Sequence, residues 1–148
     1  MTAVTCYVLD AHTGAPAFGM AVALRCLSHF HPFSQAQFLP LSGGCHWNLT
    51  PFMESVAANT DTAWEVDFDV RNYYKEAKNL WPEVKFCFHI RKTEGYFIAL
   101  HVGQGSYTVS SRLLPTGLHA SPNDLQVGKN SSGLEYLTDH SLVTLSNM

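Results

Sequence analysis

The sequence predicts an all-β domain, an antiparallel β-sandwich that carries one short helix. Six runs of seven or eight residues are rich in β-branched and aromatic side chains, and most are bounded by turn-forming residues. One short segment alone has the composition of a helix. Hydrophobic residues make up 46% of the 148 residues and charged residues 14%, which suits a single domain with a buried core.

The first half of the chain predicts two strands and a long loop. Residues 4–10 form the first strand, which ends in a turn through Gly14 and Pro16. Residues 20–26 form the second strand, and its nearness in sequence predicts that the two strands pair in one sheet. Residues 27–57 contain three His and four Phe without sustained periodicity. They predict an inserted loop with one short strand at most.

The second half predicts four strands and the helix. Residues 64–70 alternate polar with apolar side chains, as expected of a strand with one buried face. Residues 71–79 are good helix formers that stop before Pro82. Joined by turns, the remaining strands are expected at residues 84–90, 96–102 and 106–113. The sandwich then spans residues 1–113, and residues 114–148 form a C-terminal extension that packs on it or trails from it.

Charge and composition exclude several classes of function. The net charge is −3 and the pI is near 6.2, so neither nucleic acid nor an anionic membrane is an expected partner. No apolar run reaches the ~20 residues that cross a bilayer, and no signal peptide is evident, so a cytoplasmic location is expected. The four cysteines are widely spaced and predict free thiols. No metal site and no cofactor are predicted.

Three segments resemble the transthyretin and 5-hydroxyisourate hydrolase family in order and spacing. Tyr7-Val8-Leu9-Asp10, followed by Gly14-Ala15-Pro16-Ala17, is similar to the family's opening His-Val-Leu-Asp and its G-x-P-A turn. Asn59-Thr60-Asp61 resembles the family's Asn-x-Asp-Gly-Arg segment, and residues 69–75 match the strand end before the helix. The resemblance covers residues 4–24 and 58–112. It implies a transthyretin-like sandwich that assembles as a homodimer or homotetramer.

The same resemblance implies a divergent member that lacks the hydrolase active-site residues. The family's opening His corresponds to Tyr7, its Arg to Ala63 and its strand His to Phe97. Its terminal Tyr-Arg-Gly-Ser falls near residues 110–113. A phenyl ring transfers no proton, and a phenol titrates near ~10 unless perturbed. Ordinary hydrolysis of 5-hydroxyisourate is therefore not expected.

Strand alternation groups the side chains of one sheet face, which in the family lines a channel between dimers. The catalytic candidates on this face are His101 for proton transfer, Tyr7 as a hydrogen-bond donor and Arg112 as a partner for a carboxylate or enolate. Ordinary structural roles stay open for each of them. The substrate-binding candidates on the same face are Leu9, Phe97, Ala99, Thr108 and Ser110. This mixture suits a planar, oxygenated small molecule.

Three functions follow from these residues. The first is a cofactor-independent enzyme that cyclises or isomerises an oxygenated aromatic or polyketide-like metabolite, for example by adding a hydroxyl to a double bond. The second is a non-catalytic carrier of an aromatic small molecule. The third is a divergent hydrolase of 5-hydroxyisourate or a related ureide. A His and an Arg on the channel face, the long aromatic loop and the C-terminal extension favour the first.

Overall fold

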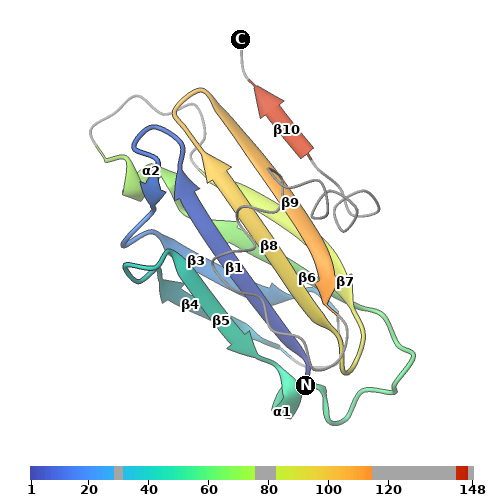
Figure 1. Cartoon of the computed structure of the whole chain (residues 1–148). Helices are drawn as coiled ribbons and strands as arrows, with labels where there is room; N and C mark the ends of the chain where they lie inside the picture. Colours follow the sequence, from blue (N-terminus) through green and yellow to red (C-terminus); the bar gives the residue numbers. More distant parts are fainter. Residues whose placement is uncertain (29–31, 76–82, 115–142, 147–148) are drawn as a thin grey trace.

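Two β-sheets face each other in the part of the chain that the computed structural model describes, which comprises residues 1–28, 32–75, 83–114 and 143–146 (Figure 1). The first sheet has the strand order β10-β9-β8-β1-β2, and β5 also pairs with β1. The second sheet has the order β4-β3-β6-β7. The predicted β-sandwich is thus confirmed, and each sheet has one face toward the core and one face outward.

The first sheet is built around β1 (Ala3–Asp10) and β8 (Gly95–Val102). These two strands run parallel in a register that joins Ala3 to Gly95 and Asp10 to Val102. A hairpin connects β8 to β9 (Ser106–Leu114), and β10 (Val143–Ser146) pairs with β9 on its far side. The other side of β1 pairs with β2 (Ala15–Pro16) at its end and with β5 (Gly44–Asn48) along its first half.

The second sheet is antiparallel throughout. It contains β3 (Ala21–Cys26), β4 (Ser34–Phe38), β6 (Thr62–Phe68) and β7 (Val84–Ile90). Two short helices lie outside the sheets, α1 (Thr50–Met53) before β6 and α2 (Val70–Tyr73) after it. None of the helices in these described segments is long and apolar enough to cross a membrane.

The pairing of the strands corrects two predictions. The sandwich is not wholly antiparallel, because β1 and β8 run parallel at the centre of the first sheet. The strands predicted at residues 4–10 and 20–26 do not pair, because β1 and β3 belong to different sheets. The short strand β2 at the intervening turn is the segment that pairs back onto β1. The chain then crosses to the other layer.

The prediction of a loop at residues 27–57 is also wrong. This stretch contains β4, β5 and α1, so that it supplies an edge strand to each sheet. Most β4 side chains are exposed, so the strand has no apolar period to reveal it. The prediction of a single helix at residues 71–79 differs from the structure in two ways, since α1 was missed and α2 ends at Tyr73. Residues 76–79 lie outside the described part of the chain.

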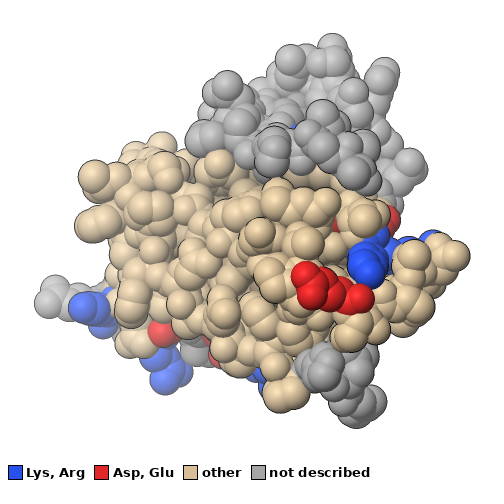
Figure 2. Space-filling view, turned by 90° about the horizontal axis from the view of Figure 1, so that it is seen from below, with Lys and Arg blue, Asp and Glu red and all other residues tan. Residues whose placement is uncertain are grey.

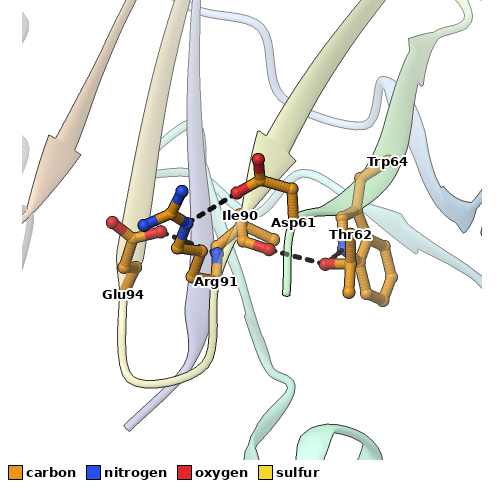
Figure 3. Close-up of polar contacts among 6 residues, drawn as sticks. All are labelled: Asp61, Thr62, Trp64, Ile90, Arg91 and Glu94. Carbon is orange, nitrogen blue, oxygen red and sulfur yellow. Dashed lines mark hydrogen bonds and ion pairs between the residues drawn. The ribbon is translucent and has the colours of Figure 1, made fainter. Parts of the chain in front are cut away.

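Apolar and aromatic side chains fill the space between the sheets. Trp64 is fully buried and meets Phe33 and Phe52 edge to face, with ring centroids 5.4 Å apart in both pairs. Its indole Nε1 donates a hydrogen bond of 2.7 Å to Thr62 Oγ1, whose hydroxyl donates to the Ile90 carbonyl at 2.7 Å (Figure 3). The Trp64 indole and the Thr62 hydroxyl are therefore both satisfied, which avoids the cost of an unpaired donor at these two groups.

An ion pair adds to this buried network where β6 begins and β7 ends. Arg91 Nε donates to Asp61 Oδ1 at 2.6 Å, and the Arg91 backbone N–H donates to Glu94 Oε1 at 2.6 Å (Figure 3). Both members of the ion pair are exposed, so water screens it. The buried hydroxyl and indole therefore stabilise this end of the sandwich more than the ion pair does.

A carboxylate fixes the end of β1 to α2. Asp10 is 3% exposed and accepts hydrogen bonds from the Tyr73 and Tyr74 hydroxyls, each at 2.9 Å. The backbone N–H groups of His12 and Thr13 donate to the same carboxylate at 2.8 and 3.4 Å. Four donors on one anion hold the turn after β1 and the C-terminal end of α2 in a fixed relation.

Candidate functional site

The outward face of the first sheet carries three rows of side chains. The registers of β5, β1, β8 and β9 place in the first row His46, Thr5, Phe97 and Arg112. The second row contains Gly44, Tyr7, Ala99 and Ser110. The third row contains Leu9, His101 and Thr108. All eight site residues predicted from the sequence therefore lie on this one face.

The middle of this face is apolar and largely buried. Tyr7, Phe97, Ala99 and Leu114 form a small hydrophobic cluster that is separate from the core between the sheets. The Tyr7 and Phe97 rings are tilted toward each other with centroids 5.7 Å apart. The Arg112 guanidinium carbon lies 5.4 Å from the Phe97 ring centroid, within the range of a cation–π contact. Aromatic rings and one cation thus meet at the centre of the face.

A hollow of about 560 Å³ opens beside this cluster, where β5 forms the edge of the face. β1 contributes Thr5 and Tyr7, and β5 contributes Gly44, Cys45 and His46. The opposite wall comes from β4 and the turn that follows it, with Gln37, Phe38, Pro40 and Ser42. Its volume falls in the usual range of small-molecule pockets, roughly 300–1,000 Å³. Of the eight predicted residues, Tyr7 is the one that lines it.

Gly44 makes room for the Tyr7 ring in this hollow. A Cβ atom at position 44 would overlap Cε1 of the Tyr7 ring, and it would lie 2.8 Å from Cδ1. The ring therefore lies flat across β5, over a residue without a side chain, while its other side faces Phe97. This position keeps the phenol at the hollow although Tyr7 is only 8% exposed.

An imidazole stands next to the phenol in the hollow. Thr5 Oγ1 and His46 Nδ1 are 2.9 Å apart and share a hydrogen bond. The Gln37 amide nitrogen donates to the His46 carbonyl at 2.9 Å, which ties β4 to β5 behind the ring. This bond to Nδ1 fixes the orientation of the imidazole ring. The structure thus places an oriented, exposed His beside Tyr7, where an acid and a base can act on the same ligand.

Sequence reasoning missed Thr5 and His46 because it had assigned residues 27–57 to a loop. A signal was present in residues 44–48, where Cys45 and Trp47 are buried and Gly44, His46 and Asn48 alternate with them outward. His29 and His31, the other two histidines of the supposed loop, lie outside the described residues. Within the described segments, no group of three or more His, Cys, Asp and Glu residues is placed to hold a metal ion.

The outward face of the second sheet carries a smaller hollow of about 260 Å³ with a different character. Arg25 pairs with Glu65 at 2.7 Å and Lys85 pairs with Glu83 at 3.3 Å around it. Burial, and then Glu83, raise the pKa of Asp67 in its wall to about 6. These charges form ion pairs with one another, as expected of a solvated sheet face. The uncharged hollow beside Tyr7 is the better candidate for a small-molecule site.

Comparison with known proteins matches this arrangement to a family. The sequence profile of the HIUase/Transthyretin family matches residues 4–110. The chain belongs to this family. Among curated proteins, a sequence search finds no match.

Solved structures of this family share the fold. The 5-hydroxyisourate hydrolase of Klebsiella pneumoniae superposes with a TM-score of 0.58 at 13% identity, over 74% of this chain and 97% of that chain. The transthyretin of Sparus aurata superposes with a TM-score of 0.60 at 16% identity, over 75% of this chain and 97% of that chain. The predicted transthyretin-like sandwich is therefore confirmed, and identities this low show the fold alone.

One assignment based on the family resemblance is corrected by the topology. Ala63, matched to the hydrolase Arg, lies on β6 in the second sheet and pairs with His89. It cannot share the face that carries Tyr7, because the whole sandwich lies between them. The residue directly opposite Tyr7 on the neighbouring strand is Gly44. The short match at Asn59-Thr60-Asp61 therefore leads into the second sheet, whereas the candidate site lies on the first sheet.

We expect Gly44→Ala to lower the free energy of unfolding by about 1–3 kcal/mol, because the added methyl group overpacks against the Tyr7 ring. Urea unfolding and the near-ultraviolet circular dichroism of the aromatic rings would measure the change. Gly105→Ala is the matched control, since a Cβ there meets nothing within 4 Å. Equal stability and equal spectra for the two variants would contradict the placement of the Tyr7 ring.

Proposed function

We propose that this family member is a cofactor-independent enzyme that cyclises or isomerises an oxygenated aromatic or polyketide-like small molecule by general acid–base chemistry. The supporting observation is the Tyr7 phenol in an open 560 Å³ hollow beside the hydrogen-bonded pair of Thr5 and His46. An acid and a base on one small-molecule site are sufficient for an isomerisation that needs no cofactor.

In this proposal the residues have distinct roles. An imidazole removes the proton from a substrate hydroxyl as its oxygen bonds to the β-carbon of a double bond that is conjugated to a carbonyl group. Tyr7 donates a hydrogen bond to the enolate oxygen that develops, and a proton returns to carbon, so that the product is an isomer of the substrate. His46 and His101 lie on opposite sides of the Tyr7 strand, and both are candidates for the base. Arg112 would bind a carboxylate or enolate oxygen.

The surroundings favour an aromatic ligand. Phe38, Pro40 and Tyr7 line the hollow, and the Tyr7 ring packs against Phe97 on the sheet. On the face that Figure 2 shows, charged side chains are few; one acidic group and a neighbouring basic group lie right of centre, and others lie along the lower left edge. In the proposal, Leu9, Ala99, Thr108 and Ser110 extend the binding surface across the face toward β9.

The test is ring closure of a phenol whose side chain carries a double bond conjugated to a carbonyl group, followed by chiral chromatography. The proposal requires product formation faster than the spontaneous reaction, with one enantiomer in excess, because a fixed acid and base approach one face of the alkene. A carrier would instead show saturable binding without product. Racemic product at the spontaneous rate with every substrate of this class would overturn the proposed reaction.

The likeness to a 5-hydroxyisourate hydrolase makes hydrolysis the second candidate. Freshly generated 5-hydroxyisourate decays spontaneously, and its ultraviolet absorbance would be followed with and without the protein. We expect no acceleration, because the two matched imidazole positions hold Tyr7 and Phe97 on the sheet face. Acceleration would assign the hollow to ureide hydrolysis instead.

We also propose that the chain assembles as a homodimer or homotetramer. Phe38 and Leu41 are each 77% exposed and Phe18 is 60% exposed, and large exposed apolar side chains are typical of interfaces. Light scattering of the purified protein would measure the assembly. A monomer at micromolar concentration would contradict this part of the proposal.

A further inference from the structure

Two cysteines face each other beneath the candidate site. Cys6 on β1 is directly opposite Cys45 on β5 in the antiparallel register. Both side chains belong to the core between the sheets, and Cys6 is 0% and Cys45 5% exposed. Burial, and then a hydrogen bond and charge interaction with Cys45, raise the pKa of the Cys6 thiol well above its usual value. The two thiols are thus in mutual contact.

The backbone pairing brings the two Cα atoms to a distance that a disulfide spans. Val8 N donates to the Gly43 carbonyl and Leu49 N donates to the Thr2 carbonyl, so alternate pairs along these strands are hydrogen-bonded pairs. Cys6 and Cys45 lie two residues from the Val8–Gly43 pair on their strands, so they are also a hydrogen-bonded pair. In such pairs the Cα atoms are about 5.5 Å apart. Disulfides most often span about 5.5–6 Å between Cα atoms. Cross-strand Cβ atoms about 5 Å apart must approach to about 4 Å, which strains the bond.

We propose that Cys6 and Cys45 form an oxidative modification site, a reversible disulfide that links β1 to β5 on exposure to a peroxide. Cys45 borders the hollow and reacts first. Its sulfur takes one oxygen from the peroxide to give a sulfenic acid and one water. The Cys6 sulfur then attacks that sulfur, the S–S bond forms and a second water leaves. Two thiols lose two electrons and two protons, which the peroxide accepts.

The bond is expected to change the candidate site, and this consequence rests on the proposed function. The residues that flank the cysteines form the pairs Tyr7–Gly44 and Thr5–His46, which face outward into the hollow. Drawing the strands together under the hollow moves β5 beneath the Tyr7 ring, which has no spare room over Gly44. A strained disulfide is also readily reduced, so the change reverses under a dithiol.

The test uses the full chain with Cys26→Ala and Cys87→Ala, which removes the half-buried and the exposed cysteine. Hydrogen peroxide is added, and peptides are mapped by mass spectrometry without reduction. The expected product is one pair of peptides from the same chain, joined through Cys6 and Cys45. Its mass is that of the two free peptides less two hydrogen atoms, and dithiothreitol separates it into those peptides. The matched control adds Cys6→Ala, in which dimedone is expected to trap the Cys45 sulfenic acid instead.

Three results would overturn parts of the inference separately. Sulfinic acid at Cys45 with Cys6 still alkylatable after denaturation would show that the disulfide does not form. The Kd of naphthol would be measured by its fluorescence for the oxidised and the reduced protein. If the disulfide forms and the two Kd values agree within twofold, the modification stands but the bond does not regulate the site. Absence of naphthol binding to the reduced protein, with the disulfide formed, would count against the proposed function and leave the modification standing.

Discussion

Tyr7→Phe is expected to lower kcat/KM for ring closure by about 10²–10⁴-fold, the usual contribution of a positioned acid. The substitution removes one oxygen from the hollow and keeps the ring that packs between Gly44 and Phe97. Substrate binding through the aromatic face is retained, so most of the loss falls on kcat. Steady-state kinetics of the enantiomerically pure product would measure it.

Control variants separate this effect from general damage to the sheet. Tyr107→Phe removes a hydroxyl from a tyrosine on β9 that packs against the core instead of the outward face, and its turnover is expected to match that of the unaltered protein. His46→Gln and His101→Gln distinguish the two candidate bases, because the true base carries the acid limb of the pH profile. Tyr7→Phe with unchanged kcat would exclude the phenol from the chemistry.

Asp10→Ala is expected to lower the free energy of unfolding by about 3–5 kcal/mol, a large share of the roughly 5–15 kcal/mol that stabilises an ordinary domain. The substitution leaves the Tyr73 and Tyr74 hydroxyls and two backbone N–H groups without their shared acceptor. Urea unfolding at neutral pH would measure the difference. Asp69→Ala is the control, because this exposed cap of α2 is worth about 1 kcal/mol. Equal losses for the two variants would contradict the role of the buried network.

The same carboxylate predicts a pH dependence with a definite sign. Burial pushes the pKa of Asp10 up, but the hydrogen bonds from Tyr74 and Tyr73, with those from the backbone, hold it below its ordinary value of 3.8. The folded-state pKa is therefore below the unfolded one, and the stabilisation is complete above the unfolded pKa and lost as pH falls through the folded pKa. The difference in the free energy of unfolding between the unaltered protein and Asp10→Asn should therefore decrease as pH falls through that acid range. A constant gap would show that the charge of Asp10 is not involved.

Most of the fold was predictable because its central strands carry strong local signals. β7 matches its predicted bounds, and β1, β3, β8 and β9 match theirs within one residue, because β-branched and aromatic runs bounded by turns are typical of strands. β4 was missed because most of its side chains are exposed, and β5 because its alternation covers only five residues inside a segment assigned to a loop. The parallel pairing of β1 with β8 was missed because pairing across the whole chain leaves no local signal.

The candidate site was predictable as a face but not as a hollow. Alternation along β8 and β9 correctly separated outward from inward side chains, which needs knowledge of one strand at a time. The pair of Thr5 and His46 required the register between β1 and β5, and β5 lay in the supposed loop. Ala63 was misplaced for the opposite reason, since a three-residue match carries no information about which sheet contains it.

The most direct test of the central claim, that a small molecule binds at Tyr7 on the outward face of the first sheet, is NMR of ring-labelled tyrosine during a titration with naphthol. The chain contains six tyrosines, and the resonance missing from Tyr7→Phe identifies Tyr7. We predict that the Tyr7 resonance shifts with naphthol concentration until the shift saturates. The resonances of Tyr73 and Tyr74, whose hydroxyls are hydrogen-bonded to Asp10, should not shift. A Tyr7 resonance that does not move while naphthol binds elsewhere would contradict the account.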